Sequence, residues 1–206
     1  MLALAAIALL GVSAAAIPVE NGGPNPADVF VESISYGGTG CPQGTVSQNF
    51  NDDRTGWTLI FDEFVANAGP GQPIFADRQN CQLSINVHLP AGWQYSVSTV
   101  DYRGFIQLDP NVIASQQSTY FFQGVLDSVS AKSQWVGPQD GYNYAVQDSF
   151  TTTSTVLSPC GGSAVVGIDT QIFVDNSRNH QGQGQMTTDS IDSKVTQIYS
   201  FNWFQC

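Results

Sequence analysis

Residues 81–90, CQLSINVHLP, carry an apolar side chain at every second position. Leu83, Ile85, Val87 and Leu89 alternate with polar residues, which is typical of a β-strand that buries one of its two faces. The same period of two recurs in three further stretches, GWTLIFDEFV (56–65), AVVGIDTQIFVDN (164–176) and VTQIYSFNWF (195–204). The pattern therefore predicts a protein built from strands.

Working outward from these stretches, the remaining runs are also short and apolar. We expect further strands at 29–36, 94–100, 103–108, 118–125 and 143–150, and a single short helix in NVIASQQS, 111–118. Turn-forming Gly, Pro, Asn and Asp residues separate the runs at intervals of about ten residues. Many short strands with regular turns predict an all-β, single-domain antiparallel β-sandwich of jelly-roll-like form.

The first residues of the sequence suggest that the protein is secreted and processed. Residues 1–16, MLALAAIALLGVSAAA, form an apolar run that ends in small residues, as a secretory signal peptide does. The run is shorter than the roughly 20 residues that a membrane-spanning helix needs. Residues 17–28 are rich in Pro, Gly and Asn and predict a flexible leader, followed by the sandwich domain at 29–206. We expect a secreted, soluble protein.

The charge of the chain restricts its partners. Its 206 residues carry a net charge of −11 with only six Lys and Arg residues, none of them clustered. Nucleic acids and anionic membranes both require grouped cations, so neither is an expected partner. A neutral polysaccharide or an extracellular protein remains compatible with this acidic surface.

The four cysteines, Cys41, Cys81, Cys160 and Cys206, are an even number, as a secreted disulfide-bonded protein requires. Four cysteines allow three pairings. We predict Cys41–Cys81 and Cys160–Cys206, because each pair then stays within one half of the chain. A zinc site is disfavoured, since no C-x-x-C motif is present and neither histidine has ligand spacing from a cysteine.

The stretch SISYGGTGCPQGT, 33–45, has the glycine content of a phosphate-binding loop. It lacks the Gly-Lys-Ser/Thr sequence and the following helix that such a loop needs. Cys41 is expected in a disulfide, which removes it as a nucleophile. We interpret the stretch as a turn between two strands.

Other candidate chemistry is weaker. The adjacent pair Asp62 and Glu63 would point to opposite faces of a strand, so no carboxylate pair for glycoside hydrolysis is identified. His88 is expected on a solvated strand face. Asn51, Asp52 and Asp53 offer hard oxygen ligands in one loop and are candidate calcium ligands, against an ordinary turn.

Aromatic residues in expected loops are the main lead to a binding function. Trp93 follows LPAG, and Trp135, Tyr142 and Tyr144 surround WVGPQDGYNY. Exposed rings beside Gln, Asn and Asp suit a sugar-binding surface, because a ring stacks on C–H groups while the polar groups bind hydroxyls. The alternative is that these rings pin the loops onto the sandwich.

Several motifs in order resemble one family. They are GGTGCPQGTVS, DDRTGWTLIFDEFVA, NCQLSINVHLPAGWQYSV, DYRGFIQLD, TQIFVDN and TTDSIDSKVTQIYSFNWFQC. Over about 36–206 the chain is similar to secreted, mainly fungal proteins catalogued as a domain of unknown function, number 4360. The resemblance implies a secreted β-rich fold with the four cysteines matched, and no activity.

These observations together predict a secreted, non-catalytic binding protein that recognises a cell-wall or extracellular glycan or a host component. The alternatives are a glycoside-acting hydrolase with an unidentified carboxylate pair and a secreted effector that acts through protein contacts.

Overall fold

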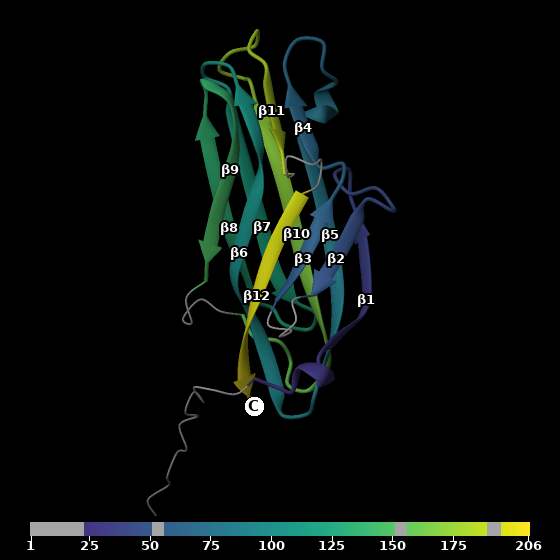
Figure 1. Ribbon diagram of the computed structural model, residues 1–206. Coiled ribbons are helices and arrows are strands. Elements are labelled where there is room, and N and C mark those ends of the chain that lie inside the picture. Colours follow the sequence, from purple (N-terminus) through teal and green to yellow (C-terminus); the bar gives the residue numbers. More distant parts are fainter. Residues whose placement is uncertain (1–22, 51–55, 151–155, 189–194) are drawn as a thin grey trace, which may run out of the picture.

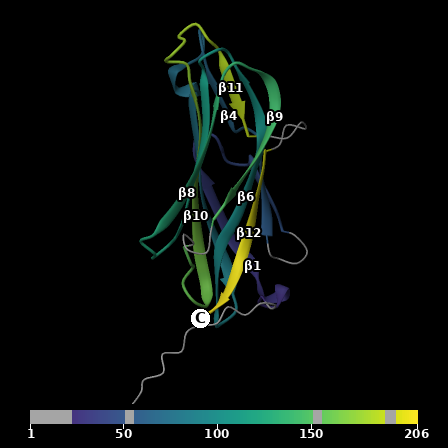
Figure 2. The ribbon, with the colours of Figure 1, turned by 90° about the vertical axis from the view of Figure 1, so that its left-hand side faces the viewer.

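The computed structural model describes residues 23–50, 56–150, 156–188 and 195–206, which form two antiparallel sheets packed face to face (Figures 1 and 2). Within these ranges there is no α-helix, and therefore no helix that is long and apolar enough to cross a membrane. The only helical elements of the described chain are the 3-10 turns η1 (Pro26–Asp28) and η2 (Ile74–Ala76). The predicted all-β antiparallel sandwich is confirmed.

The first sheet contains, in spatial order, β1 (Phe30–Gly37), β5 (Arg78–Leu89), β10 (Gly162–Asp175), β7 (Ile113–Phe122) and β8 (Ser128–Val136). The second contains β2 (Val46–Phe50), β3 (Gly56–Phe61), β12 (Val195–Gln205), β6 (Trp93–Leu108), β11 (Gly184–Thr187) and β4 (Val65–Ala68), with β9 (Gln139–Ser149) also paired to β6.

Strand β6 organises the second sheet because it is long enough to pair with three strands. Strand β9 pairs with 99–108 along one edge of β6. Along the other edge, β12 pairs with 93–102 and β11 with 105–108. Strands β11 and β12 therefore follow one another beside β6, and β11 brings β4 into the sheet at the upper end in Figure 1.

The core lies between the two sheets and follows the predicted alternation. Leu83, Ile85, Val87 and Leu89 are at most 1% exposed, and the inward residues of β10 are buried with them. A hydrogen-bonded polar band crosses this core, where Ser118 donates to Thr170 over 2.8 Å. Burial of these two polar side chains is tolerated because they hydrogen-bond to each other between the neighbouring strands β7 and β10 of the first sheet.

Two local predictions are wrong. The stretch 111–118 is not helical, and most of it belongs to β7, whose inward residues include the polar Gln116 and Ser118. Because these inward residues are polar, the alternation of apolar and polar side chains that predicts a strand is absent from this stretch. The separate strands expected at 94–100 and 103–108 are one continuous strand, β6. Within it, Gly104 allows the end of β11 to approach closely, since a Cβ there would lie 2.1 Å from the carbonyl oxygen of Thr187.

Both predicted disulfides are present. Cys41–Cys81 joins the β1–β2 connection to β5, and Cys160–Cys206 joins the β9–β10 connection to the C-terminus. The glycine-rich stretch around Cys41 is a turn, as interpreted: at Gly38, with φ of +154°, a Cβ would lie 2.1 Å from the carbonyl oxygen of Asn80. The expected signal peptide, 1–16, lies outside the described residues and stays a prediction.

Candidate functional site

A groove of about 260 Å³ lies on the outer face of the second sheet, lined by residues in or next to β4, β6 and β11. Strands β4 and β11 are labelled near the upper end of Figure 1. Its lining is mostly polar and consists of Asn67, Ala68, Gln72, Gln107, Asp109, Gln183, Gly184 and Gln185. Five of these eight residues carry a carboxamide side chain, and most of the five are exposed to solvent. We call this site the carboxamide groove.

Three of the carboxamides form one row across the sheet. In the ladder, Gln185 of β11 pairs with Asn67 of β4 on one side and with Gln107 of β6 on the other. Directly paired residues project from the same face of a sheet. Ala66, Ile106 and Met186 are buried, so the row residues next to them in the strands (Asn67 after Ala66, Gln107 after Ile106 and Gln185 before Met186) face outward.

The row is partly fixed. Nε2 of Gln185 donates to Oδ1 of Asn67 over 3.0 Å, which holds both amide planes. Among the described residues no hydrogen bond occupies the side chain of Gln107. Since a carboxamide carries two donors and an acceptor with two lone pairs, the row retains unused groups of both kinds for a ligand.

The groove has different borders above and below the row. Above it, the Gln183 backbone N–H donates to Oδ2 of Asp109 over 2.8 Å, and the Asp109 backbone N–H donates to the Gln183 carbonyl oxygen over 2.9 Å. Below it, Phe105 pairs with Thr187 in the ladder. The Phe105 ring lies over Gly141, where a Cβ would be 3.1 Å from Cζ. The groove therefore has a polar border above the carboxamides, and Phe105 lies one outward position below the row, outside the residues that line the groove.

Local packing explains why β11 can sit here. At Gly184 a Cβ would lie 2.6 Å from Cγ1 of Val174 and 2.7 Å from Cγ1 of Val112, so only glycine allows the strand to pack so closely on the core. The connection that leads into β11 is held by Asp175, which accepts a hydrogen bond from the Ser177 backbone over 2.8 Å. Hydrogen bonds from Ser177, helped by the nearby charges of Arg178 and His180, lower the pKa of Asp175.

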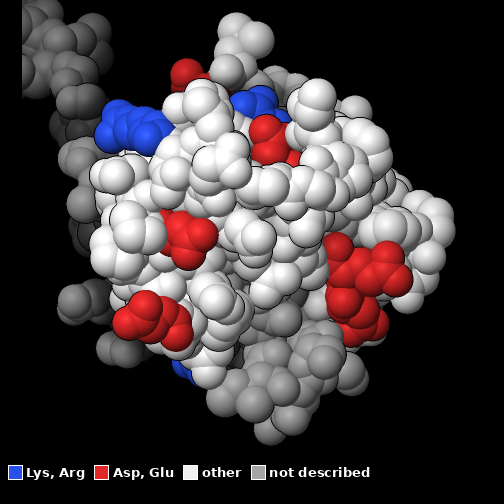
Figure 3. Space-filling view, turned by 90° about the horizontal axis from the view of Figure 1, so that it is seen from above, with Lys and Arg blue, Asp and Glu red and all other residues white. Residues whose placement is uncertain are grey.

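The groove lining carries a single charged side chain. Asp109 is its single ionisable lining residue, and no Lys, Arg or His is among the described residues that line it. Viewed from the upper end, the molecule shows mostly uncharged surface with separate acidic patches (Figure 3). The groove is thus chemically suited to a neutral, hydroxyl-rich ligand.

The four aromatic residues expected to bind a ligand do not form one cluster. Trp93 begins β6 and pairs with Gln205, at the opposite end of the strand from the groove. Trp135 and Tyr144 lie together, with ring centroids 4.7 Å apart. Tyr142, on the same strand as Tyr144, is 41% exposed. Their role in binding stays a prediction, but the assignment of all four to loops is wrong, because Trp93 begins β6 and the other three lie in β8 and β9.

Tyr144 is in fact a core residue, only 3% exposed. Its hydroxyl donates to Oε1 of Gln116 at 3.1 Å and is hydrogen-bonded to the Thr188 hydroxyl at 3.2 Å. Through its ring it supports Trp135. Its environment matches the alternative interpretation, in which a ring anchors neighbouring segments onto the sandwich.

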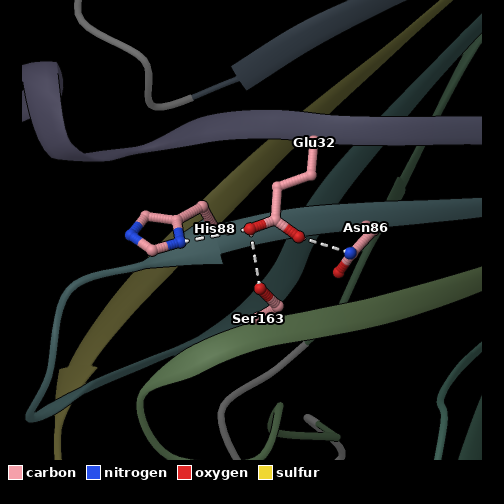
Figure 4. Close-up of polar contacts among 4 residues, drawn as sticks. All are labelled: Glu32, Asn86, His88 and Ser163. Carbon is pink, nitrogen blue, oxygen red and sulfur yellow. Dashed lines mark hydrogen bonds and ion pairs between the residues drawn. The ribbon is translucent and has the colours of Figure 1, made fainter.

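His88 belongs to a polar cluster on the outer face of the first sheet (Figure 4). Its Nδ1 lies 3.3 Å from Oε1 of Glu32, which also accepts a hydrogen bond from Ser163 over 2.8 Å. Asn86 donates to the other carboxylate oxygen of Glu32. Because Glu32 contacts residues of both β5 and β10, the cluster fastens the edge strand β1 to the sheet.

The candidate calcium ligands Asn51, Asp52 and Asp53 lie outside the described residues, so calcium binding there stays a prediction. Within the described part of the chain, no group of three or more His, Cys, Asp or Glu residues could hold a metal ion.

Sequence reasoning missed the carboxamide groove. Asn67, Gln107 and Gln185 are far apart in the chain and have no motif in common. A signal did exist, because each is an outward residue of a strand whose inward neighbours are apolar. Only the pairing of β4, β11 and β6 brings these positions together.

Comparison with known proteins adds a family and a compartment. A family model described as Domain of unknown function (DUF4360) matches residues 27–206. An uncharacterized secreted protein of Arthroderma benhamiae is 42% identical over 193 residues, which are 92% of this chain and 78% of that protein. With the two disulfides, this relative agrees with the predicted location, and the protein is secreted.

Solved structures are similar only at a low level. TmCBM61 in complex with β-1,4-galactotriose has a TM-score of 0.26 and 14% identity, over 89% of this chain and 97% of that one. The enzymatically active domain of bacteriophage CBA120 tailspike protein 4 has a TM-score of 0.25 and 12% identity, over 87% of this chain and 21% of that one. Likenesses at these TM-scores carry no argument about function.

Proposed function

Because the chain belongs to the family described as Domain of unknown function (DUF4360), as its motifs indicate, and that description names no activity, we propose a function from the groove itself. The protein is a secreted, non-catalytic binding protein, and its ligand is a neutral glycan of a cell wall or extracellular matrix. The observation that carries this proposal is the row of Asn67, Gln185 and Gln107 on an exposed sheet face.

The chemistry of the row matches that of a sugar. Each sugar hydroxyl is both a donor and an acceptor, and a carboxamide offers both groups in one plane without the desolvation cost of a charge. Phe105, at the lower border, adds an apolar ring beside the polar row, as sugar C–H groups require. An anionic ligand is disfavoured by Asp109 and by the net charge of −11.

A binding role fits the groove better than hydrolysis does. Glycoside hydrolysis by the common mechanism needs two carboxyl groups on either side of the bond, and the groove lining contains one, Asp109.

The test is polysaccharide pull-down and glycan-array binding by the full secreted chain with its disulfides intact. The groove variant is Asn67→Ala/Gln107→Ala/Gln185→Ala, and Gln134→Ala, an exposed glutamine of β8 in the other sheet, is the matched control. We expect the groove variant to lose binding while Gln134→Ala retains it, with equal thermal midpoints for the two.

A second variant tests the aromatic prediction directly. Trp93→Ala/Trp135→Ala/Tyr142→Ala should leave glycan binding in place if the groove is the site. If binding is instead lost in this folded variant and kept in the groove variant, the groove assignment is wrong and the aromatic residues carry the function.

One observation favours protein contacts as a second candidate function. Ile74 and Phe75 stand side by side in the η2 turn and are 91% and 79% exposed. Two neighbouring large apolar side chains with this exposure would lose unfavourable contact with water on binding a protein partner. Substitution of both with Ser should leave glycan binding unchanged. The same variant should no longer retain a protein partner that the unmodified protein captures from the extracellular fluid.

A further inference from the structure

The carboxamide row has a direction, because its three members belong to three neighbouring strands. Gln185 pairs with Asn67 and with Gln107, so the row runs perpendicular to β4, β11 and β6. Neighbouring strands lie about 4.8 Å apart, and three of them set three carboxamides along a line of roughly 10 Å. The groove therefore offers a repeating set of polar groups with a fixed period.

We infer that the groove binds an extended, β-linked neutral glycan chain that lies across the strands, with one sugar residue over each carboxamide. This inference rests on the proposed function and names the class of glycan. The length of one sugar residue in an extended β-1,4-linked chain is close to one strand spacing. Successive residues of such a chain can thus meet Asn67, Gln185 and Gln107 in turn.

The borders of the row support a chain that lies flat along it. The backbone bonds between Asp109 and Gln183 fix the upper border. Below the row, Val65 and Phe105 occupy the next outward positions of β4 and β6, and Thr187 of β11, between them in the ladder, is buried at 6% exposure. Val65 and Phe105 are half-buried and apolar, on either side of Thr187. A flat chain would therefore meet amides along one edge and apolar groups along the other.

A coiled or single-sugar ligand would use the row poorly. An α-1,4-linked chain curves, so that after one residue its hydroxyls leave the line of the amides. A monosaccharide reaches one carboxamide, or two at most. Because Gln185 and Asn67 are already held together by a 3.0 Å hydrogen bond, their free groups are oriented in advance and cannot follow a curved ligand at no cost.

The experiment is titration calorimetry of the full, disulfide-bonded chain with defined oligosaccharides. The probes are β-1,4-linked glucose, mannose and xylose oligomers of one to six residues, and α-1,4-linked glucose oligomers of the same lengths. For one of the β-linked series we expect the affinity to rise by about fivefold per residue up to three residues, since each residue adds about one neutral hydrogen bond, and then to level off. The α-linked series should show no such rise.

Variants assign the rise to the row. Gln107→Ala, at one end, should move the plateau from three residues to two, whereas Gln185→Ala, at the centre, should remove most of the rise. Gln134→Ala should reproduce the unmodified protein, and thermal midpoints verify that all variants are folded.

The outcomes separate this inference from the proposed function. If the protein binds glycans through the groove but a disaccharide binds as tightly as a hexasaccharide, or α-linked oligomers bind as well as β-linked ones, the extended-chain inference is overturned and the proposed function stands. If no glycan binds in either the calorimetric or the array assay, both are overturned.

Discussion

Substitution of Tyr144 by Phe tests whether the Tyr144 hydroxyl holds the core or faces a ligand. The hydroxyl donates to Oε1 of Gln116 at 3.1 Å, and Gln116 is only 2% exposed. Nε2 of Gln116 has no hydrogen-bond partner within the described residues. Without the tyrosine hydroxyl, Oε1 of the buried Gln116 would therefore lose the hydrogen bond that it accepts, while its Nε2 already has no partner among the described residues.

The size of the effect follows from this geometry. Leaving a buried acceptor without its donor costs about 1 to 3 kcal/mol of unfolding free energy. For a domain of this length, 1 kcal/mol lowers the thermal midpoint by about 2 to 4 °C. The ring of Phe retains the contact with Trp135, so the loss is confined to the hydroxyl.

Urea unfolding of the disulfide-intact protein measures this loss as a lower midpoint with an unchanged slope. The matched control is Tyr142→Phe, two positions away on β9, where the side chain is 41% exposed. Its unfolding free energy should stay within about 0.5 kcal/mol of the unmodified protein. If Tyr144→Phe is as stable as the unmodified protein but binds glycan more weakly, the hydroxyl faces the ligand and the reasoning is refuted.

Three further predictions concern what holds the sandwich together. Replacing Cys41 and Cys81 with Ser should lower the unfolding free energy by about 4 kcal/mol in urea, because their sequence separation of 40 closes a long loop; a loss under 1 kcal/mol would contradict the entropic estimate. Gly104→Ala should lower the thermal midpoint by several degrees, since its Cβ would meet the β11 backbone, whereas Gly37→Ala, with nothing within 4 Å, should not. Asp175→Asn should destabilise the protein at pH 7 but not at pH 2: the lowered pKa contributes stability that is present above the unfolded pKa and lost as pH falls, so a pH-independent difference in urea midpoints would exclude this.

The sequence predicts the architecture well wherever one face of a strand is uniformly apolar. Strand β5 is the clearest case, because its inward residues from Leu83 to Leu89 are all aliphatic. Where the core accepts polar groups, the same logic fails. In β7 the inward Gln116 and Ser118 are buried through hydrogen bonds to other strands, so their burial depends on partners that no local pattern contains.

The proposed binding site was harder to predict than the fold, because exposed amides on strands are common and aromatic residues in apparent loops are a stronger sequence signal for ligand binding. Trp135 and Tyr144 look like a binding pair in sequence, yet Tyr144 is buried and its hydroxyl bonds within the core. A large ring is suited both to packing and to stacking on a sugar, and sequence cannot separate these two uses. Burial separates them.

The carboxamides show the opposite case, in which each residue is unremarkable alone and the arrangement is informative. Exposed Gln and Asn are common on strands, so Asn67, Gln107 and Gln185 carry no signal one by one. Their significance comes from register: a shift of β11 by one residue would turn Gln185 into the core and bring Met186 to the surface. Because burial of Met186 and close packing of Gly184 forbid that shift, the forces that fix the fold also fix the row. A variant that lengthens β11 by one residue before Gly184 should therefore lose stability and glycan binding together, whereas Gln185→Ala should lose binding alone.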